Sequence, residues 1–396
     1  MLKKKTLDSI DFKGKRALVR VDYNVPLDAS GHITDDTRIR ATLPTINHIL
    51  DNGGSLIIIS HLGRPKDKPE PSLSLAPVSK RLSRLLKLEV QFMPNCIGDE
   101  VQRAANGLKP GSVLMLENLR FHPGETKNDP DFSRQLAALA DIYIDDAFAN
   151  SHREHASVIG VPSYLHPAIA GFLMEKEINY FNKALAEPVR PLVAMLGGAK
   201  TSDKIKTIES LMEKVDKIII GGGMAFTFLK TMGYHLGKSL VEEDMLDLAA
   251  DIMGQARSRG IPFYLPVDCI AADAREEKAK TMVVPAQEIP DDMMGLDIGP
   301  ATVILFNHVL EQARTIVWNG PMGVFELSPF SKGTFSMVDT LANCRGLTII
   351  GGGDTDVAVH ATGNSDKIDY ISTGGGAFIR LLEKGELPGF NALDDA

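Results

Sequence analysis

The chain has 396 residues, of which 44% are hydrophobic and 24% are charged, and it carries a formal net charge of −8. This length exceeds the roughly 250–300 residues at which one hydrophobic core stops growing, so one small domain is excluded and two domains are expected. The composition is that of a globular protein and excludes an intrinsically disordered chain. The acidic balance argues against binding to nucleic acid or an anionic membrane, because proteins that do so display a positive surface.

Two further features bear on where the protein works. Its three cysteines, Cys96, Cys269 and Cys344, lie far apart and form no CxxC pair, which argues against a disulfide framework and a thiolate zinc site. The amino terminus is basic and then polar, without the apolar segment of a signal peptide, and the longest apolar runs are strand-sized. We therefore expect a soluble cytoplasmic protein.

The first part of the chain alternates short β-branched runs with longer amphipathic segments. Four runs have the composition of strands buried on both faces of a parallel sheet: 17–21, 55–59, 113–116 and 142–144. Between the first two, apolar residues recur at helical spacing over 39–50, after a polar start at 34–36 and before two glycines at 53–54. This pattern predicts an α/β domain with a helix between its first two strands.

The second part of the chain repeats this alternation. Five strand-like runs predict a second sheet of five strands: 192–196, 217–220, 261–267, 315–318 and 347–350. Between the two parts, residues 173–186 have the pattern of one charged helix that ends before Pro188 and Pro191. We interpret this helix as the connection between two domains.

These elements predict the fold class and its division. The fold class is α/β, with two similar-sized domains, each a parallel sheet covered by helices (Rossmann-like), joined by a helical hinge around an interdomain cleft. We place the first domain at 1–170, the interdomain helix and hinge at 171–190, and the second domain at 191–380. The C-terminal segment 381–396 is expected to pack back on the first domain. Because open α/β sheets bind ligands beyond the carboxyl ends of their strands, we expect the site in the cleft.

Glycine-rich turns that open toward a helix are the most informative feature of the second part. They lie at 196–200, 220–223, 350–355 and 372–376. Glycine lets backbone N–H groups approach an anion closely, and a helix N-terminus adds positive partial charge, so such turns are typical of phosphate sites. Each turn alone would be interpreted as an ordinary strand-to-helix turn, but their repetition favours a nucleotide or phosphate ligand.

Standard phosphate-loop patterns are absent. Residues 233–239 resemble a Walker A loop but have three residues between the glycines where that loop has four. No strand is followed by a strict GxGxxG with an acidic residue at the appropriate distance, which gives a dinucleotide fold little support.

Charged side chains follow the strands of the first part. Arginine and histidine occur at 20–26, 61–65, 119–122 and 152–155, and Arg38 opens the first helix. If these loops converge at one edge of the sheet, they form a local positive pocket suited to bidentate capture of phosphate and carboxylate. A solvated surface position is the ordinary alternative for each arginine alone.

Three places are candidates for a metal ion. His152 and His155 lack a third clustered ligand, so a polar network explains them better than a metal site. The pair Asp145-Asp146 could hold magnesium. We prefer Asp354, because it stands beside phosphate-type glycines, where one carboxylate and nucleotide oxygens share Mg²⁺.

Seven motifs stand in order along the chain: RVDYNVP (20–26), SHLGRP (60–65), ENLRF (117–121), GGAK (197–200), GLDIGP (295–300), WNGP (318–321) and GGGDT (351–355). Together they resemble the motifs of the phosphoglycerate kinase family across nearly the whole chain. The resemblance implies a glycolytic enzyme that binds 3-phosphoglycerate or 1,3-bisphosphoglycerate on the first domain and ADP or ATP, with Mg²⁺ as cofactor, on the second. The residues by themselves indicate the kinds of pocket and not the substrate.

Carried over position by position, the resemblance implies two sets of contacts. The phosphoglycerate contacts are Asp22, Asn24, Arg38, His61, Arg64, Arg120 and Arg153. The nucleotide contacts are Lys204, Gly295, Asn319, Glu326, Gly352, Gly353, Asp354 and Thr355, with Glu326 toward the ribose and Asp354 on the metal. Two residues depart from the family's pattern. Thr201 stands where an aliphatic residue is common, and Asp356 stands where a small one is usual and adds negative charge near a phosphate site unless it faces away.

The chemistry implied by the resemblance needs positive charge and no base. In the ATP-forming direction an oxygen of ADP attacks an acyl phosphate, and in reverse the nucleophile is a carboxylate already ionised near pH 7. The site must align the reactants and stabilise charge on the transferring phosphoryl group. We assign this catalytic role to Arg38 and Lys200, one from each domain, which reach the group together when the cleft closes.

Two other functions stay open from the sequence alone. A two-domain protein that closes on a phosphorylated ligand without catalysis would share the cleft and the arginines, but it would not explain a lysine and an aspartate at separate glycine turns. An NAD-dependent oxidoreductase is disfavoured by the missing fingerprint. We expect a monomer without a nucleic-acid or membrane partner.

Overall fold

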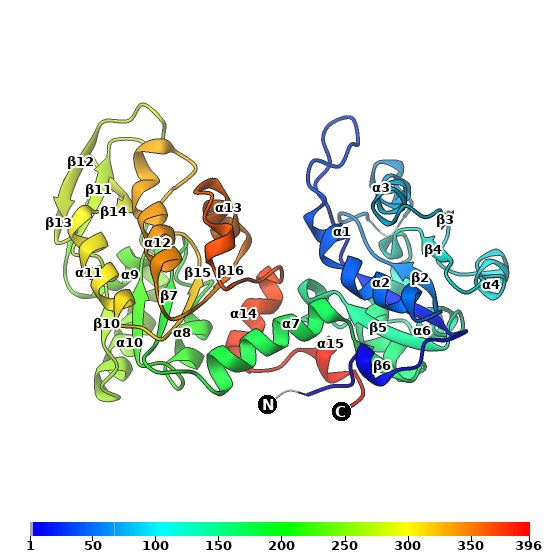
Figure 1. Ribbon diagram of the computed structural model, residues 1–396. Helices are drawn as coiled ribbons and strands as arrows, with labels where there is room; N and C mark the ends of the chain where they lie inside the picture. Colours follow the sequence, from blue (N-terminus) through cyan, green and yellow to red (C-terminus); the bar gives the residue numbers. More distant parts are fainter. Residues whose placement is uncertain (1–2, 67) are drawn as a thin grey trace. The chain divides into compact units, whose positions relative to one another are not determined.

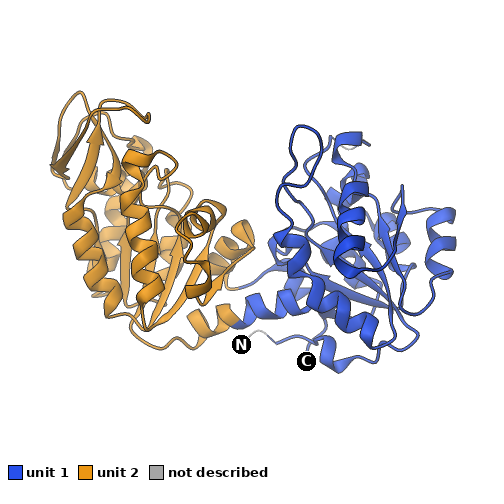
Figure 2. Ribbon diagram, turned by 45° about the horizontal axis from the view of Figure 1, so that its top comes forward, with its two compact units in different colours: residues 1–179, 386–396 blue, residues 180–385 orange. Residues whose placement is uncertain are grey.

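The computed structural model describes residues 3–66 and 68–396 (Figure 1). The chain divides into two compact units (Figure 2). Unit 1 contains the described residues up to Asn179 together with Glu386–Ala396, and unit 2 contains Tyr180–Gly385. The division falls within helix α7 (Phe172–Phe181), which is followed by a π-helical turn over Asn182–Ala186. It differs by several residues from the boundaries expected at 170, 190 and 380, and residues 381–385 stay in unit 2.

Unit 1 contains a six-stranded parallel sheet in the order β3-β4-β2-β1-β5-β6. Its strands are β1 (Arg16–Val21), β2 (Ser55–Ile59), β3 (Val90–Met93), β4 (Val113–Leu116), β5 (Ile142–Asp146) and β6 (Ala168–Ala170). The four strands expected from the sequence are β1, β2, β4 and β5. The sequence analysis missed β3 and β6, because only the first residue of β3 is buried and β6 is only 3 residues long.

Helices connect the strands of unit 1. They are α1 (Thr37–Ala41), α2 (Leu43–Asp51), α3 (Ala76–Leu86), α4 (Asp99–Asn106), α5 (Pro123–Thr126), α6 (Pro130–Ala137) and, from the C-terminal segment, α15 (Pro388–Asn391). The single helix expected over 39–50 is instead two, α1 and α2, which meet at Thr42. Pro44 explains the break, because it has no N–H to donate to the preceding turn and is tolerated at the start of a new helix.

Unit 2 contains a second six-stranded parallel sheet in the order β10-β8-β7-β15-β16-β17. Its strands are β7 (Leu192–Leu196), β8 (Lys217–Ile220), β10 (Phe263–Tyr264), β15 (Thr315–Asn319), β16 (Leu347–Gly351) and β17 (Tyr370–Ile371). The expected count of five strands is therefore wrong by one, and the strand expected at 261–267 is only 2 residues long. Its helices are α8 (Ile205–Leu211), α9 (Met224–Thr231), α10 (Leu246–Ser258), α11 (Pro300–Glu311), α12 (Lys332–Asn343), α13 (Gly353–Ala361) and α14 (Gly375–Lys384).

Unit 2 also contains two small sheets that the sequence analysis did not predict. One is antiparallel and joins β11 (Asp268–Ala272) to β12 (Thr281–Pro285) and β14 (Met294–Ile298); the other pairs β9 (His235–Leu236) with β13 (Glu288–Ile289). Their apolar residues form a separate small core with Phe226 and Leu229 of α9. Two α/β domains with one parallel main sheet each confirm the predicted fold class.

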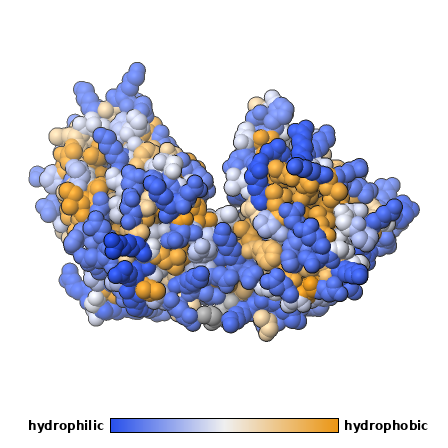
Figure 3. Space-filling view, viewed as in Figure 1, coloured by the Kyte–Doolittle hydropathy of each residue, from blue (hydrophilic) through white to orange (hydrophobic). Residues whose placement is uncertain are grey.

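Polar residues cover much of the face seen in Figure 3, with apolar residues between them. None of the helices within residues 3–66 and 68–396 has the length and apolar content needed to cross a membrane.

Candidate active site

In unit 1, the predicted phosphoglycerate residues follow strands whose carboxyl ends meet at one edge of the sheet. Asp22 and Asn24 follow β1, His61 and Arg64 follow β2, and Arg38 lies on α1. Arg120 lies on the 3-10 turn Leu119–Phe121 after β4, and Arg153 lies in the loop after β5. Because neighbouring strands are parallel, the loops that follow them all leave the sheet at the edge formed by the carboxyl ends of the strands.

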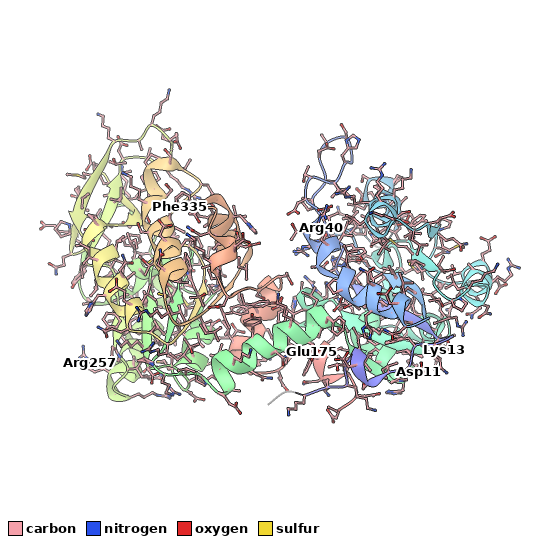
Figure 4. The ribbon with its side chains drawn as sticks, viewed as in Figure 1. Asp11, Lys13, Arg40, Glu175, Arg257 and Phe335 are labelled. Carbon is pink, nitrogen blue, oxygen red and sulfur yellow. The ribbon has the colours of Figure 1, made fainter. Side chains whose placement is uncertain are left out.

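The Asp22 carboxylate connects three of these residues. Its Oδ2 accepts a hydrogen bond from Nη1 of Arg38, and its Oδ1 accepts one from the backbone N–H of Asn24 at 3.2 Å. His61 Nδ1 lies 3.8 Å from the same Oδ1. Arg40 lies on the same helix as Arg38 (Figure 4), but its Nε donates to Asp36 at 2.8 Å.

Hydrogen bonds to Gly63, in the loop after β2, connect this loop to the loops after β1 and β4. Asn24 Oδ1 accepts from the Gly63 N–H at 2.7 Å, and Arg120 Nη1 donates to the Gly63 carbonyl at 2.7 Å. Burial, followed by the charges of Arg153 and Arg20, lowers the pKa of Arg120 to about 10. The pKa of Arg153 is lowered by burial and by Arg64, and its buried Nε has no hydrogen-bond acceptor among the residues described.

His61 shows how closely these charges gather. Its ring is 4% exposed, and its pKa is lowered well below the usual value, first by burial and then by four arginines: Arg20, Arg120, Arg153 and Arg38. The structure therefore groups all seven predicted phosphoglycerate residues into one basic cluster, defined here as Asp22, Asn24, Arg38, His61, Arg64, Arg120 and Arg153. Repulsion among its cations would be relieved by an anion with several negative charges.

The alternative metal candidates of unit 1 have structural partners. His155 Nδ1 lies 3.6 Å from the fully buried Glu125 carboxylate. Asp146 is also buried, and its Oδ1 accepts from the Leu173 N–H at 2.8 Å in the first turn of α7. Within the described ranges, no group of three His, Cys, Asp or Glu residues is arranged to hold a metal ion.

Unit 2 contains a pocket of about 450 Å³ beside its glycine turns. The pocket is lined by Gly198, Ala199, Gly222, Gly223, Lys238, Leu240, Arg275, Met294, Gly295, Leu296, Pro321, Gly323, Val324, Glu326 and Asp354. At Gly222, φ is +66° and a Cβ atom would lie 2.6 Å from the Gly198 carbonyl, so only glycine fits between these turns. Three of the predicted nucleotide residues line this pocket: Gly295, Glu326 and Asp354.

The remaining predicted nucleotide residues form a chain of contacts leading to Asp354. Lys204 Nζ donates to Asn319 Oδ1, and Asn319 Nδ2 donates to the Gly351 carbonyl at 2.7 Å. Thr355 Oγ1 accepts from the Gly320 N–H at 2.8 Å. Gly352, with φ +104°, precedes α13, and Gly353 and Asp354 form its first turn. Burial lowers the pKa of Lys204 to about 8, so this ammonium group is poorly solvated where no ligand compensates it.

Lys200, which is predicted to be catalytic, lies outside the lining of the pocket. It is exposed and directly follows Ala199, which lines the pocket. The two departures from the family's pattern have local partners: Thr201 Oγ1 donates to the Met224 carbonyl at 3.1 Å, and Asp356 Oδ1 lies 3.1 Å from His360 Nε2.

Sequence reasoning missed the pocket wall formed by the small antiparallel sheet. Met294 and Leu296 belong to β14, Arg275 follows β11, and the Lys238 N–H donates to the Met293 carbonyl at 2.7 Å. The only signal in the sequence was the neighbouring GLDIGP motif. Two carboxylates, those of Glu326 and Asp354, line the pocket. Mg²⁺ commonly takes one or two carboxylates and completes its shell with phosphate oxygens and water.

Comparisons with known proteins agree with this arrangement. The family model described as phosphoglycerate kinase matches residues 7–385. Phosphoglycerate kinase of Geobacter metallireducens is 59% identical over 390 residues, 98% of each chain, and that of Aquifex aeolicus is 55% identical over 395 residues, 100% of this chain and 99% of the other. The solved structure of phosphoglycerate kinase from Coxiella burnetii is 39% identical, covers 98% of both chains and has a TM-score of 0.90.

The fold, the site and these matches define a kinase, that is, an enzyme of the transferase class. The chain belongs to the phosphoglycerate kinase family, and this membership supports a function in glycolysis.

Proposed function

We propose that the enzyme reversibly transfers a phosphoryl group from 1,3-bisphosphoglycerate to MgADP, giving 3-phosphoglycerate and MgATP. One observation carries the proposal: the basic cluster of unit 1 and the glycine-lined pocket of unit 2 offer two different anion sites, one rich in arginine and one rich in backbone N–H groups. Two anionic substrates of different chemistry match these two sites.

The basic cluster is proposed to bind the phosphoglycerate. Arg64, Arg120 and Arg153 supply planar donors that suit phosphate and carboxylate oxygens. Asn24 positions Gly63 beside them, and Asp22 orients Arg38. The buried Nε of Arg153 lacks an acceptor in the part of the chain that the structure describes, which agrees with a ligand that supplies one.

The glycine-lined pocket is proposed to bind the nucleotide. Leu240, Met294, Leu296 and Val324 line the pocket and are proposed to contact the base, and Glu326, which also lines it, is proposed to accept from the ribose hydroxyls. Lys204, Asn319 and Gly352–Thr355 are proposed to face the phosphates, with Asp354 as the magnesium ligand. When bound, Mg²⁺ would neutralise phosphate charge and orient the phosphate chain.

Catalysis is proposed to rest on Arg38 and Lys200 without a general base, because the nucleophile in either direction is already ionised near pH 7. Both side chains would stabilise negative charge on the transferring group. Since Arg38 belongs to unit 1 and Lys200 to unit 2, their joint action requires the units to bring their ligands together. We propose a hinge motion for this step.

A coupled assay tests the proposal. With 3-phosphoglycerate, ATP and Mg²⁺, the product acyl phosphate is consumed by a dehydrogenase whose NADH oxidation is followed by absorbance. We expect turnover that needs all three components. A protein that binds both ligands and gives no turnover would instead be a binding protein. Light scattering would test whether the protein is a monomer, as expected. All three cysteines are free, which agrees with the expected cytoplasmic location.

A further inference from the structure

Arg20, in β1, is a buried arginine behind the basic cluster. It is 1% exposed, and none of the described carboxylates lies within ion-pairing distance of it. Its Nε donates to Ser157 Oγ at 2.9 Å, its Nη1 donates to the Val21 carbonyl, and its Nη2 lies 3.3 Å from His61 Nδ1. Burying a cation is costly unless its donors are satisfied, so each of these contacts matters.

Two buried carboxylates interact electrostatically with Arg20, those of Asp145 and Glu125, and Glu125 is connected to Arg20 through one side chain. Ser157 Oγ accepts from Arg20 and donates to Glu125 Oε1 at 2.7 Å, while the Ser157 N–H donates to Glu125 Oε2 at 2.9 Å. Glu125 is fully buried. Burial raises the pKa of this carboxyl, but the hydrogen bond with His155, the charge of Arg20 and the bond with Ser157 together lower it below the usual value. The carboxylate therefore stays ionised and holds Arg20 through the Ser157 hydroxyl.

The contact between Arg20 and His61 decides where the imidazole proton resides. Arginine has donors and no acceptor, so the Nδ1 atom of His61 must be the acceptor and the proton is on Nε2. Among the described residues, the charged groups that act on the ring include Arg20 and Asp22 at β1, Arg38 on α1, Arg120 after β4 and Arg153 after β5. Asp22 lies 3.8 Å from Nδ1, beyond hydrogen-bond distance, and its oxygens already accept from Arg38 and Asn24.

We propose that Arg20 is a positioning residue for phosphoglycerate binding: held by Glu125 through Ser157, it fixes His61 as the neutral Nε2–H tautomer, which donates to an anionic oxygen of the substrate. The part that concerns the substrate rests on the function proposed above. The part that concerns the tautomer rests on the free protein alone.

The tautomer is measured first, without substrate. Long-range ¹H–¹⁵N correlation spectra of histidine-labelled protein report which ring nitrogen carries the proton. We expect the His61 ring to remain neutral, with its proton on Nε2, between about pH 5.5 and 8, where an ordinary histidine titrates. A ring that titrates in this interval, or that carries its proton on Nδ1, would overturn the proposal.

Kinetics then test the consequence with Arg20→Met, which removes the donor and the charge. The freed Nδ1 is expected to take a proton toward Asp22, which leaves Nε2 without one at high pH. The ratio of variant to wild-type KM for 3-phosphoglycerate should reach roughly 10-fold near pH 8, the worth of a hydrogen bond to a charged group, and fall toward pH 6 as the ring becomes doubly protonated. The kcat should stay within about twofold. A KM ratio that does not depend on pH, with an unchanged tautomer, would refute the role.

Three further variants separate positioning from structure. Arg20→Lys keeps a donor toward Nδ1 and should make the KM ratio independent of pH. In Arg20→Met combined with His61→Gln, the amide donor does not titrate, so the pH dependence should vanish. Ser157→Ala removes only the connecting hydroxyl, so it should shift the ring's titration in the same direction by less, and it provides the test if Arg20→Met does not fold.

The control is Arg16→Met, which removes an arginine from the other end of β1, where it pairs with Asp141 at 3.1 Å. It should leave KM unchanged at every pH. The outcomes also distinguish the two proposals. The expected tautomer in a protein that does not turn over would refute the proposed function, and a turning-over enzyme with a titrating His61 would refute the role of Arg20 alone.

Discussion

Each of the two units contains a proposed anion site, and the two proposed sites are built from different groups. In unit 1 the proposed donors are side chains, and burial, followed by the charges of neighbouring arginines, lowers the pKa values of Arg120 and His61. In unit 2 the proposed donors are largely backbone N–H groups at glycine turns, and the pKa of Lys204 is lowered by burial and not by neighbouring cations. A site built from side chains should depend on single charges. A site built from backbone should depend on single Cβ atoms, and the buried Lys204 should make nucleotide binding in unit 2 depend on pH.

The largest expected effect is on kcat, and it comes from one residue of each unit, Arg38 and Lys200. We expect Arg38→Ala and Lys200→Ala each to lower kcat by about 10³-fold, the scale seen for an arginine that stabilises a phosphoryl-transfer transition state, with much smaller changes in KM. Because both are proposed to act on one group, the double variant should lose less than the product of the two losses. Steady-state kinetics in the coupled assay measure this. Single variants that keep the wild-type kcat would demote both residues to ground-state contacts.

Next in size are single charges of the basic cluster. Arg64→Ala and Arg120→Ala should raise KM for 3-phosphoglycerate by roughly 10–100-fold, because each removes a charge-assisted hydrogen bond made equally in the ground and transition states. KM for MgATP should barely change. A larger effect on MgATP than on phosphoglycerate would show that the ligands are assigned to the wrong units.

Removal of the Asp354 carboxylate has the third-largest expected effect. Asp354→Ala should weaken MgADP binding by about tenfold in isothermal titration, since it removes the proposed magnesium ligand without opening a core cavity. The matched control is Asp356→Ala, two residues further on the same helix, whose carboxylate lies beside His360. Equal losses in both variants would remove the special role of Asp354.

Adding a Cβ atom at Gly222 tests whether the unit 2 site depends on close approach of backbone groups. Gly222→Ala forces alanine into a left-handed conformation, which costs roughly 1–2 kcal/mol, and places its Cβ 2.6 Å from the Gly198 carbonyl. We expect about tenfold weaker MgADP binding and unchanged KM for 3-phosphoglycerate. Gly254→Ala is the control, because a Cβ there meets no atom within 4 Å. Full nucleotide affinity in Gly222→Ala would contradict the proposed cradle.

The smallest expected effect is a pH dependence confined to unit 2. Lys204 has a pKa of about 8 in the free protein, and a bound phosphate should raise it by stabilising the ammonium form. MgADP affinity should therefore be constant below about pH 8 and fall severalfold as the pH rises from there toward 9. Titrations across this range should show the decline in the wild type and in Lys206→Met, which alters an exposed neighbour, and not in Lys204→Met. A decline that persists in Lys204→Met would assign it to another group.

Much of the fold could be predicted because buried parallel strands need continuous apolar runs, which β2, β4 and β7 have. The short strands β3, β6 and β17 could not, since a few residues leave no periodic pattern and form strands only where a neighbour offers its open edge. The split of the first helix at Thr42 follows from Pro44, a signal that was present and overlooked.

The sequence by itself determined the family and the identity of the charged and glycine residues, because side-chain chemistry and φ freedom are properties of single residues. Only the tertiary structure decided which of them meet. Arg20 lies within a predicted strand, but its hydrogen-bond partner Ser157 is 137 residues away along the chain. Glu125 contacts Arg20 only through Ser157. Arg275 follows β11 and Lys238 follows β9, two strands that the sequence analysis did not predict, and both residues line the pocket. Such contacts depend on packing between distant segments, and no local pattern encodes packing of that kind.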